Sequence, residues 1–279
     1  MSNFYLNISN FFNPKFKFNL SLAPENYYFM VKDSELKKVL KNFNDKDGIY
    51  YWYRIKKEFE ILKENEGKDK SLTFLNSKIK NLKFKSSKIY FELGNIYKGF
   101  KEYNKSIQNY NFALEGINKN SDSYADILYR RGGSYERLKD YKKADKDLLL
   151  SLELNPDQPY VLNYLAYSWL ERKIKINQSM EMLLKAYERT QDDPYIIDSV
   201  GWAYYLTEDY ISAEKYLKNA LLIMPDDPIV NDHYGDVLWK LNMRLQASYY
   251  WNAALSSDEA EEQLKKEINK KLLFGLKNS

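Results

Sequence analysis

The residue types needed for catalysis or metal binding are sparse in this chain. It contains one histidine, His233, and no cysteine. A histidine-based metal site, or a nucleophile with its base, would need a second imidazole or a thiol to help. Asp232 precedes His233 directly, but adjacency in sequence fixes no geometry, and such a pair is more typical of a polar surface or groove contact. We therefore expect no catalysis, no metal site and no cofactor.

Other motifs for small-molecule chemistry are also missing from the sequence. No glycine-rich phosphate-binding motif is present. The Gly132-Gly133 pair falls inside a helical pattern, where Gly132 occupies a close-packing position and Gly133 faces outward into a groove. The composition favours recognition of another macromolecule instead, because the side chains of 26 tyrosines and 5 tryptophans bury much area at low entropy cost. We expect no small-molecule substrate.

A helical repeat of about 34 residues must position these aromatic side chains. From about Lys88 onward, small residues recur at the eighth, twentieth and twenty-seventh positions of each unit. They include Gly94, Ala113, Gly132, Ala144, Ala166, Ala186, Gly201, Ala213, Ala220, Gly235, Ala247 and Ala254. A glycine inside a helix costs about 1 kcal/mol relative to alanine. Its periodic use therefore predicts pairs of helices that cross too closely for a larger side chain.

This pattern resembles the tetratricopeptide repeat, in which each unit is a pair of helices joined by a tight turn. The resemblance implies an all-α protein: a right-handed α-solenoid, or superhelix, of helix-turn-helix repeats with a C-terminal capping helix. We expect degenerate helical repeats at 1–86, five repeats at 87–256, and a polar capping helix at 257–279. The third repeat has one extra residue in the turn before Ser179.

The ends of the chain are predicted in less detail. Residues 49–82 are typical of two helices joined at Glu66-Gly67-Lys68. Residues 22–30 and 34–43 are typical of another helix pair. The chain is therefore expected to begin inside the solenoid, which suggests a truncated start. Near the other end, Ser256 stands three residues before Glu259, the spacing of a capping box. This spacing predicts the start of the capping helix there.

In tetratricopeptide proteins the first helix of each pair lines a concave groove, with its second, fifth, ninth and twelfth positions pointing inward. Carried over by register, these positions and one flanking tyrosine hold aromatic side chains, carboxylates and an amide. The candidate partner-binding residues are Tyr160, Asn163, Tyr164, Tyr167, Tyr195, Asp198, Trp202, Tyr205, Asp232, Asp236 and Trp239. The carboxylates favour a basic or amide-rich segment and would repel a terminal carboxylate. The alternative is that the aromatic rings pack between helices and the acids only solvate the surface.

Residues from about Leu162 to Leu255 resemble the C-terminal part of a family of bacterial tetratricopeptide proteins. The similarity lies in LNYLAYSWL, IIDSVGWAYYL, VNDHYGDVLWK and a following A-x-x-x-W-x-x-A-L. Many members of that family are exported, and they include proteobacterial outer-membrane lipoproteins and adaptors that recruit carboxy-terminal processing proteases. The resemblance implies a scaffold that binds a protein or peptide segment in its groove and supports an envelope or protease-adaptor complex.

A second interpretation starts from charge. Residues 1–120 hold 22 Lys and Arg against 13 Asp and Glu, while the rest holds 21 against 26. Within the basic half, a cluster mixes rings and cations in the manner of a single-strand nucleic-acid site: Tyr51, Trp52, Tyr53, Arg54, Lys56 and Lys57. The same run also fits an amphipathic helix with its aromatic side chains inward, and helical periodicity favours that interpretation.

The sequence leaves the compartment and the oligomeric state open. The N-terminus has neither a basic segment with an apolar run nor a cysteine for acylation, so as written the chain is predicted to be soluble, with no signal peptide or lipobox. No stretch approaches the roughly 18 consecutive apolar residues of a transmembrane helix. Either the chain is a fragment of a longer exported, periplasmic protein, or it is an intracellular relative.

Overall fold

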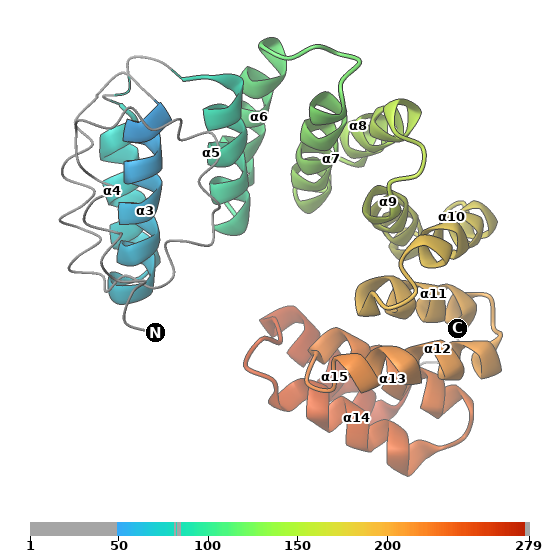
Figure 1. The fold of residues 1–279 in the computed structure, drawn as a ribbon. Helices are drawn as coiled ribbons and strands as arrows, with labels where there is room; N and C mark the ends of the chain where they lie inside the picture. The colour runs from blue at the N-terminus through green and yellow to red at the C-terminus, as the bar shows by residue number, and fades with distance from the viewer. Residues whose placement is uncertain (1–48, 81, 83–84, 277–279) are drawn as a thin grey trace, which may run out of the picture. The chain divides into compact units, whose positions relative to one another are not determined.

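A computed structural model describes residues 49–80, 82 and 85–276, and in these residues the regular elements are the helices α3 to α15 (Figure 1). The predicted all-α fold is confirmed. The predicted helix pair at 22–30 and 34–43 lies outside the described residues. The chain divides into two compact units, Met1–Phe84 and Lys85–Ser279. No helix in the described ranges is both long enough and apolar enough to cross a membrane.

The described part of the first unit is a helix pair, α3 (Ile49–Glu66) and α4 (Lys68–Ile79). Gly67 joins the two helices with a φ of 83°, in the left-handed region that favours glycine, so the predicted junction is confirmed. Trp52, Phe59 and Leu75 are buried in this unit. The spacing of these apolar residues places them on the facing sides of the two helices.

The second unit contains five helix pairs followed by a single helix, and the predicted solenoid of tetratricopeptide type is confirmed. The pairs are α5 (Ser87–Gly99) with α6 (Tyr103–Glu115), α7 (Asp122–Arg137) with α8 (Tyr141–Leu154), α9 (Pro159–Glu171) with α10 (Ile176–Arg189), α11 (Pro194–Leu206) with α12 (Tyr210–Ile223), and α13 (Pro228–Lys240) with α14 (Arg244–Ser256). The last helix is α15 (Glu262–Phe274). Within this unit the pairs follow one another in an arc, with α7, α9 and α11 on its inner side and α8 and α10 outside (Figure 1).

Small residues bring the two helices of each pair close together. A methyl group added to Gly201 would lie 2.6 Å from Leu217 Cγ, and one added to Gly235 would lie 2.5 Å from Trp251 Cδ1. In the same way, a methyl group added to Gly94 or Gly132 would overlap the side chain sixteen residues later, which is Tyr110 or Leu148. The eight alanines of the repeat pattern are fully buried: Ala113, Ala144, Ala166, Ala186, Ala213, Ala220, Ala247 and Ala254. A larger side chain at these positions would push the helices apart.

The turns within the pairs also follow the repeat. The second turn residue has a positive φ in each pair, as at Glu208 with 64° between α11 and α12. The turn between α9 and α10 has one residue more than that turn, as predicted. It accommodates the extra residue with a second left-handed position, Lys175, at a φ of 49°. This insertion makes α9 and α11 repeat at a spacing of 35 residues rather than 34.

The start of the last helix differs from the prediction. Ser256 is the final residue of α14, and its hydroxyl donates to the carbonyl of Asn252 at 2.8 Å instead of capping a new helix. The chain then makes a turn that buries Ala260, and α15 begins at Glu262 without a side-chain cap at Glu261. The predicted capping box at Ser256 and Glu259 is therefore wrong, because α14 extends through the serine.

Candidate partner-binding groove

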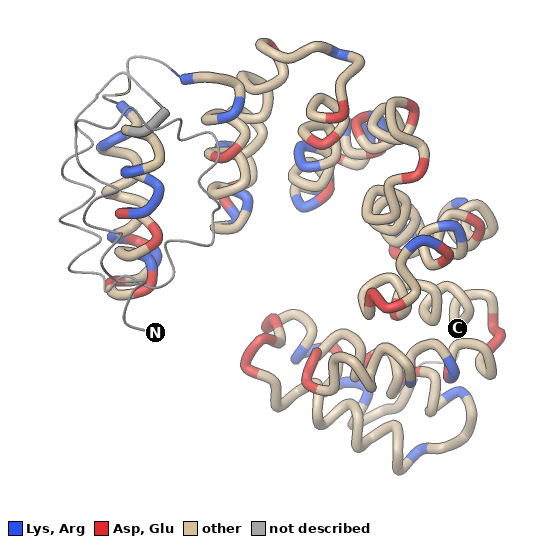
Figure 2. The backbone as a smooth tube through the Cα atoms, viewed as in Figure 1, with Lys and Arg blue, Asp and Glu red and all other residues tan. Residues whose placement is uncertain are grey.

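The first helices of the second unit form the inner face of the arc, and we take this face as the candidate site. The middle of the face has few charged residues, since α9 and α11 each contain a single carboxylate and no lysine or arginine (Figure 2). One polar cluster lies on each side of this middle region. The C-terminal cluster is built on α11, α13 and α15, and the N-terminal cluster on α5, α7 and α9.

His233 and Asp198 form the first contact of the C-terminal cluster. His233 Nδ1 on α13 lies 2.9 and 3.1 Å from the two carboxylate oxygens of Asp198 on α11, and both side chains are buried. Burial disfavours the charged imidazolium, but the neighbouring carboxylate of Asp198 outweighs burial and raises the pKa of His233 above its ordinary value. The only histidine of the chain therefore balances a buried acid.

Trp202 lies between two flat side chains. Its ring stacks on His233 at a centroid distance of 4.1 Å and an interplanar angle of 13°, and on Tyr205 at 4.6 Å and 11°. Its indole nitrogen donates to Glu171 Oε1 at 3.0 Å. Because partners on α9, α11 and α13 fix this ring, it is a rigid part of the inner face rather than a freely rotating side chain.

Lys271 of α15 binds both of the other two predicted groove carboxylates. Its amino group donates to both oxygens of Asp232, at 2.9 and 2.7 Å, and to Asp236 at 2.9 Å. Asp236 also accepts from the indole nitrogen of Trp251 at 2.9 Å. Both carboxylates are buried, at 6% and 4% exposure. These acids are thus satisfied by side chains of the chain itself.

Trp239 is covered by the end of the chain. Its ring packs against Trp251 at a centroid distance of 5.3 Å, and the guanidinium of Arg244 lies 4.3 Å from its centre. Gly275, with a φ of 69°, approaches the ring so closely that a methyl group at this glycine would overlap it. Trp239 is therefore part of the contact between α13 and the residues after α15.

The N-terminal cluster is organised around Tyr164 on α9. Its hydroxyl donates to Glu136 Oε2 at 2.9 Å, and its ring meets Tyr129 edge to face at 5.9 Å. The amino group of Lys98, reaching from α5, lies 5.8 Å from the centre of the Tyr164 ring. A methyl group at Gly133 would lie 2.6 Å from that amino nitrogen. Glycine at this position therefore leaves the space that Lys98 occupies.

The remaining predicted groove residues differ in exposure. Tyr160 and Tyr195, in the first turns of α9 and α11, are 51% and 62% exposed. Tyr167 is half-buried, with its ring 6.4 Å from that of His233, and burial raises its pKa. Asn163 is half-buried, and its side-chain oxygen accepts no hydrogen bond from the described residues. These side chains complete the middle of the inner face.

Sequence reasoning missed Lys98 and Lys271. It assigned His233 to a polar surface or groove contact with Asp232, whereas the partner of His233 is Asp198. The register of the repeat contained a signal for Lys98, because it occupies the twelfth position of the first repeat and Gly133 the ninth position of the second. Lys271 gave no such signal, since it follows the last repeat. Its contact with α13 depends on how α15 packs.

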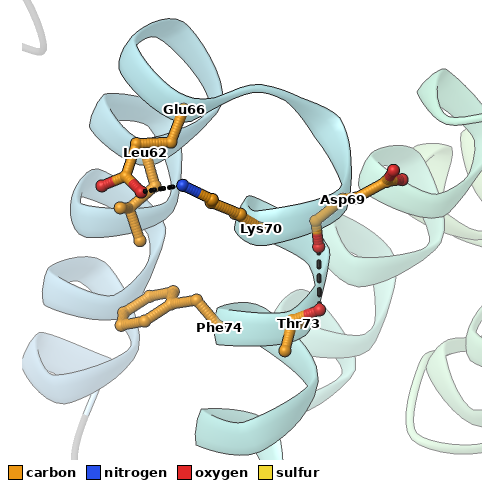
Figure 3. Close-up of a pocket in the computed structure, with 6 residues that line it drawn as sticks. All are labelled: Leu62, Glu66, Asp69, Lys70, Thr73 and Phe74. Carbon is orange, nitrogen blue, oxygen red and sulfur yellow. Dashed lines mark hydrogen bonds and ion pairs between the residues drawn. The ribbon is translucent and has the colours of Figure 1, made fainter.

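The hollows of the described residues include two whose lining residues can be named. The first is a shallow pocket of about 430 Å³ at the turn between α3 and α4, where Lys70 pairs with Glu66 at 3.1 Å (Figure 3). The second, of about 390 Å³, lies beside the first turns of α7 and α9 and includes Tyr129 and Tyr160. The described residues contain no group of three or more His, Cys, Asp or Glu that could hold a metal ion.

Stacked helix pairs with an inner face of fixed aromatic rings define a helical-repeat protein. The repeats are of the tetratricopeptide type, because a family model described as "Tetratricopeptide repeat" matches residues 87–115 and 125–158. The chain thus contains tetratricopeptide repeats at these residues. It is 34% identical over 111 residues to a "TPR repeat-containing protein" of Pseudomonas aeruginosa. The match includes 40% of this chain but 19% of that protein, so the chain spans about a fifth of the relative's length.

Solved structures show the same fold at low sequence identity. A thermophilic tetratricopeptide protein of Thermus thermophilus superposes with a TM-score of 0.56 at 18% identity, over 68% of this chain and 100% of the other. PilW, described as a type IV pilus biogenesis factor, superposes with a TM-score of 0.56 at 22% identity, and the match covers 68% of this chain and 86% of PilW. PilF of Pseudomonas aeruginosa superposes with a TM-score of 0.54 at 17% identity, and the match covers 67% of this chain and 91% of PilF. These similarities establish the solenoid fold.

Proposed function

We propose that this protein is a non-enzymatic scaffold or adaptor that binds a segment of another protein along the inner face of its second unit. The observation that supports this proposal best is the pair Tyr160 and Tyr195. They occupy equivalent positions of adjacent repeats and are 51% and 62% exposed, on helices α9 and α11, of which α11 also contains the rigid ring of Trp202. Aromatic anchors on a preformed surface are typical of protein-binding sites.

A finer proposal concerns the process that the scaffold serves. The resemblance of residues 162–255 to exported bacterial tetratricopeptide proteins supports a role in assembling an envelope complex or a protease-adaptor complex. A periplasmic location would follow from that role.

Nucleic-acid binding through residues 51–57 is not supported. Stacking on bases needs rings that solvent can reach. Tyr51 and Trp52 are 8% and 2% exposed, because they pack inside the first unit. Lys57 pairs with Glu60 at 2.7 Å. The amphipathic-helix interpretation of this segment is therefore the better one.

Site-specific photo-crosslinking tests the proposed function. A benzoyl-phenylalanine replaces Tyr160, Tyr195 or, as a matched control, Tyr249, which is 68% exposed on the second helix α14. In cells of the source organism, we expect the two inner-face positions to capture the same protein and Tyr249 not to capture it. The double variant Y160A/Y195A should bind the captured protein at least about tenfold more weakly. Equal capture from Tyr249, or no shared protein, would reject the proposal.

A further inference from the structure

Lys98, on the inner face, forms no ion pair with an acid of the described residues. Lys98 is half-buried on α5, with its amino nitrogen 5.9 and 5.8 Å from the centres of the Tyr129 and Tyr164 rings. Burial, together with the nearby Arg130 and Arg137, lowers the pKa of Lys98 to about 8. A lysine in this environment gains from any anion that comes within reach.

The two nearest carboxylates are engaged by other groups. Glu136 accepts the hydroxyl proton of Tyr164 at 2.9 Å and lies 3.6 Å from Arg137 Nε. Asp126 accepts from Arg130 Nε at 3.4 Å. The cluster therefore contains three cations and two carboxylates, and one positive charge is left over. The Arg137 side chain is 58% exposed, so this excess of charge faces solvent.

At the opposite end of the inner face, three buried carboxylates share two cations. Asp232 and Asp236 are buried against Lys271, and Asp198 against His233. These acids are buried, whereas the excess positive charge at the Lys98 end is exposed at Arg137.

We propose that Lys98, assisted by Arg137 and the Tyr164 ring, binds an aspartate or glutamate side chain of the partner, so that the groove selects an acidic peptide segment. This inference rests on the proposed function. The backbone at Gly133 gives the amino group its room, and the Tyr129 and Tyr164 rings hold it on the inner face. A charge-assisted hydrogen bond to a carboxylate would replace the water that a half-buried ammonium group binds poorly.

A peptide suits this site better than a nucleic acid. Recognition of a phosphate chain needs several cations in a row. Here one uncompensated charge lies next to Glu136 and Asp126, which would repel neighbouring phosphates. A peptide can place one carboxylate at Lys98 and apolar side chains over the uncharged middle of the groove.

Selection from a displayed library of random peptides tests the inference. The intact chain is used as bait, in parallel with K98M, with K98R and with the control K105M, an exposed lysine on the second helix of the same pair. We expect the wild-type chain, K98R and K105M to enrich peptides that contain Asp or Glu, and K98M to enrich peptides without this preference. Wild-type enrichment of peptides without acidic residues would overturn the inference but leave the proposed function intact. Failure to enrich any peptide relative to Y160A/Y195A would instead contradict the proposed function.

A pH series provides a readout that does not depend on how well K98M folds. The most enriched acidic peptide should bind the wild-type chain about tenfold more weakly at about pH 9 than at about pH 7, because Lys98 loses its proton in this range. In K98R the affinity should stay constant, since a guanidinium remains charged. An equal pH response in both proteins would overturn the inference. So would a single-stranded oligonucleotide that displaces the peptide from the wild-type chain but not from K98M.

Discussion

Lys271 of α15 and Asp232 of α13 are joined by two hydrogen bonds, of 2.9 and 2.7 Å, across 39 residues of sequence. The amino group also reaches Asp236, so one cation satisfies two buried carboxylates. This contact fastens the last helix to the fifth repeat. It also explains why two acids at groove positions are not free to bind a partner.

Loss of Lys271 should destabilise the C-terminal end of the solenoid. In K271M two buried carboxylates lose their only cation, and removing one partner of a buried ion pair costs about 3–5 kcal/mol. We expect urea unfolding, followed by circular dichroism, to show this loss. The matched variant K270M, at an exposed position of the same helix, should unfold like the wild type. Equal midpoints for both variants would show that the ion pair contributes nothing.

His233 should titrate above its ordinary pKa of 6.5. As the only histidine, it gives one imidazole signal in a proton NMR titration. In D198N we expect the pKa to fall, because burial then acts without the acid that offsets it. A pKa that is unchanged in D198N would contradict the assigned contact.

The same contact predicts how stability depends on pH. A folded-state pKa above the unfolded value means that the folded state binds the proton more tightly. The stabilisation is therefore complete below about pH 6.5 and is lost as pH rises through the raised pKa of His233. Unfolding in urea at several pH values should show this decline in the wild type and a flatter profile in H233Q.

Overpacking of the helix pair α11–α12 should be costly. Ala213 is fully buried, in a cluster with Leu217 and Trp251. In A213L the larger side chain should cost about 1–3 kcal/mol of the free energy of unfolding. N219L, an exposed position on the same helix, is the control and should change the urea midpoint little.

Two glycines with open space around them should respond to alanine in opposite ways. A methyl group would meet no atom within 4 Å at Gly67 or at Gly99. Gly67 has a left-handed φ of 83°, so G67A should destabilise the first unit by about 1–2 kcal/mol. Gly99 ends helix α5, and G99A should stabilise by about 0.4–1 kcal/mol. Thermal melting of the two variants in opposite directions would confirm that backbone conformation decides the outcome.

The sequence predicted the fold well because the decisive signals are local and periodic. Glycine and alanine at fixed positions predict the helix pairs, and the additional residue before Ser179 predicts the longer turn of the third repeat. The start of α15 was mispredicted, because a serine three residues before a glutamate resembles a cap even when the preceding helix runs through the serine.

The electrostatics of the candidate site could not be predicted in the same way. Register places Asp198, Asp232 and Asp236 on the first helices, but it does not show which cations approach them. His233 comes from the next repeat and Lys271 from beyond the last one. The charge presented to a partner depends on these tertiary contacts.

The arc of the second unit also meets its own beginning. Lys101, in the turn after α5, pairs with Glu261 at 2.6 Å, just before α15, although 160 residues separate them. Both side chains are 67% exposed, and water and salt weaken such pairs. The two ends of the arc are therefore joined by a weak ion pair that thermal motion can break. If a partner binds the inner face as proposed, opening of this pair would admit the middle of a polypeptide, and no free chain end would be needed.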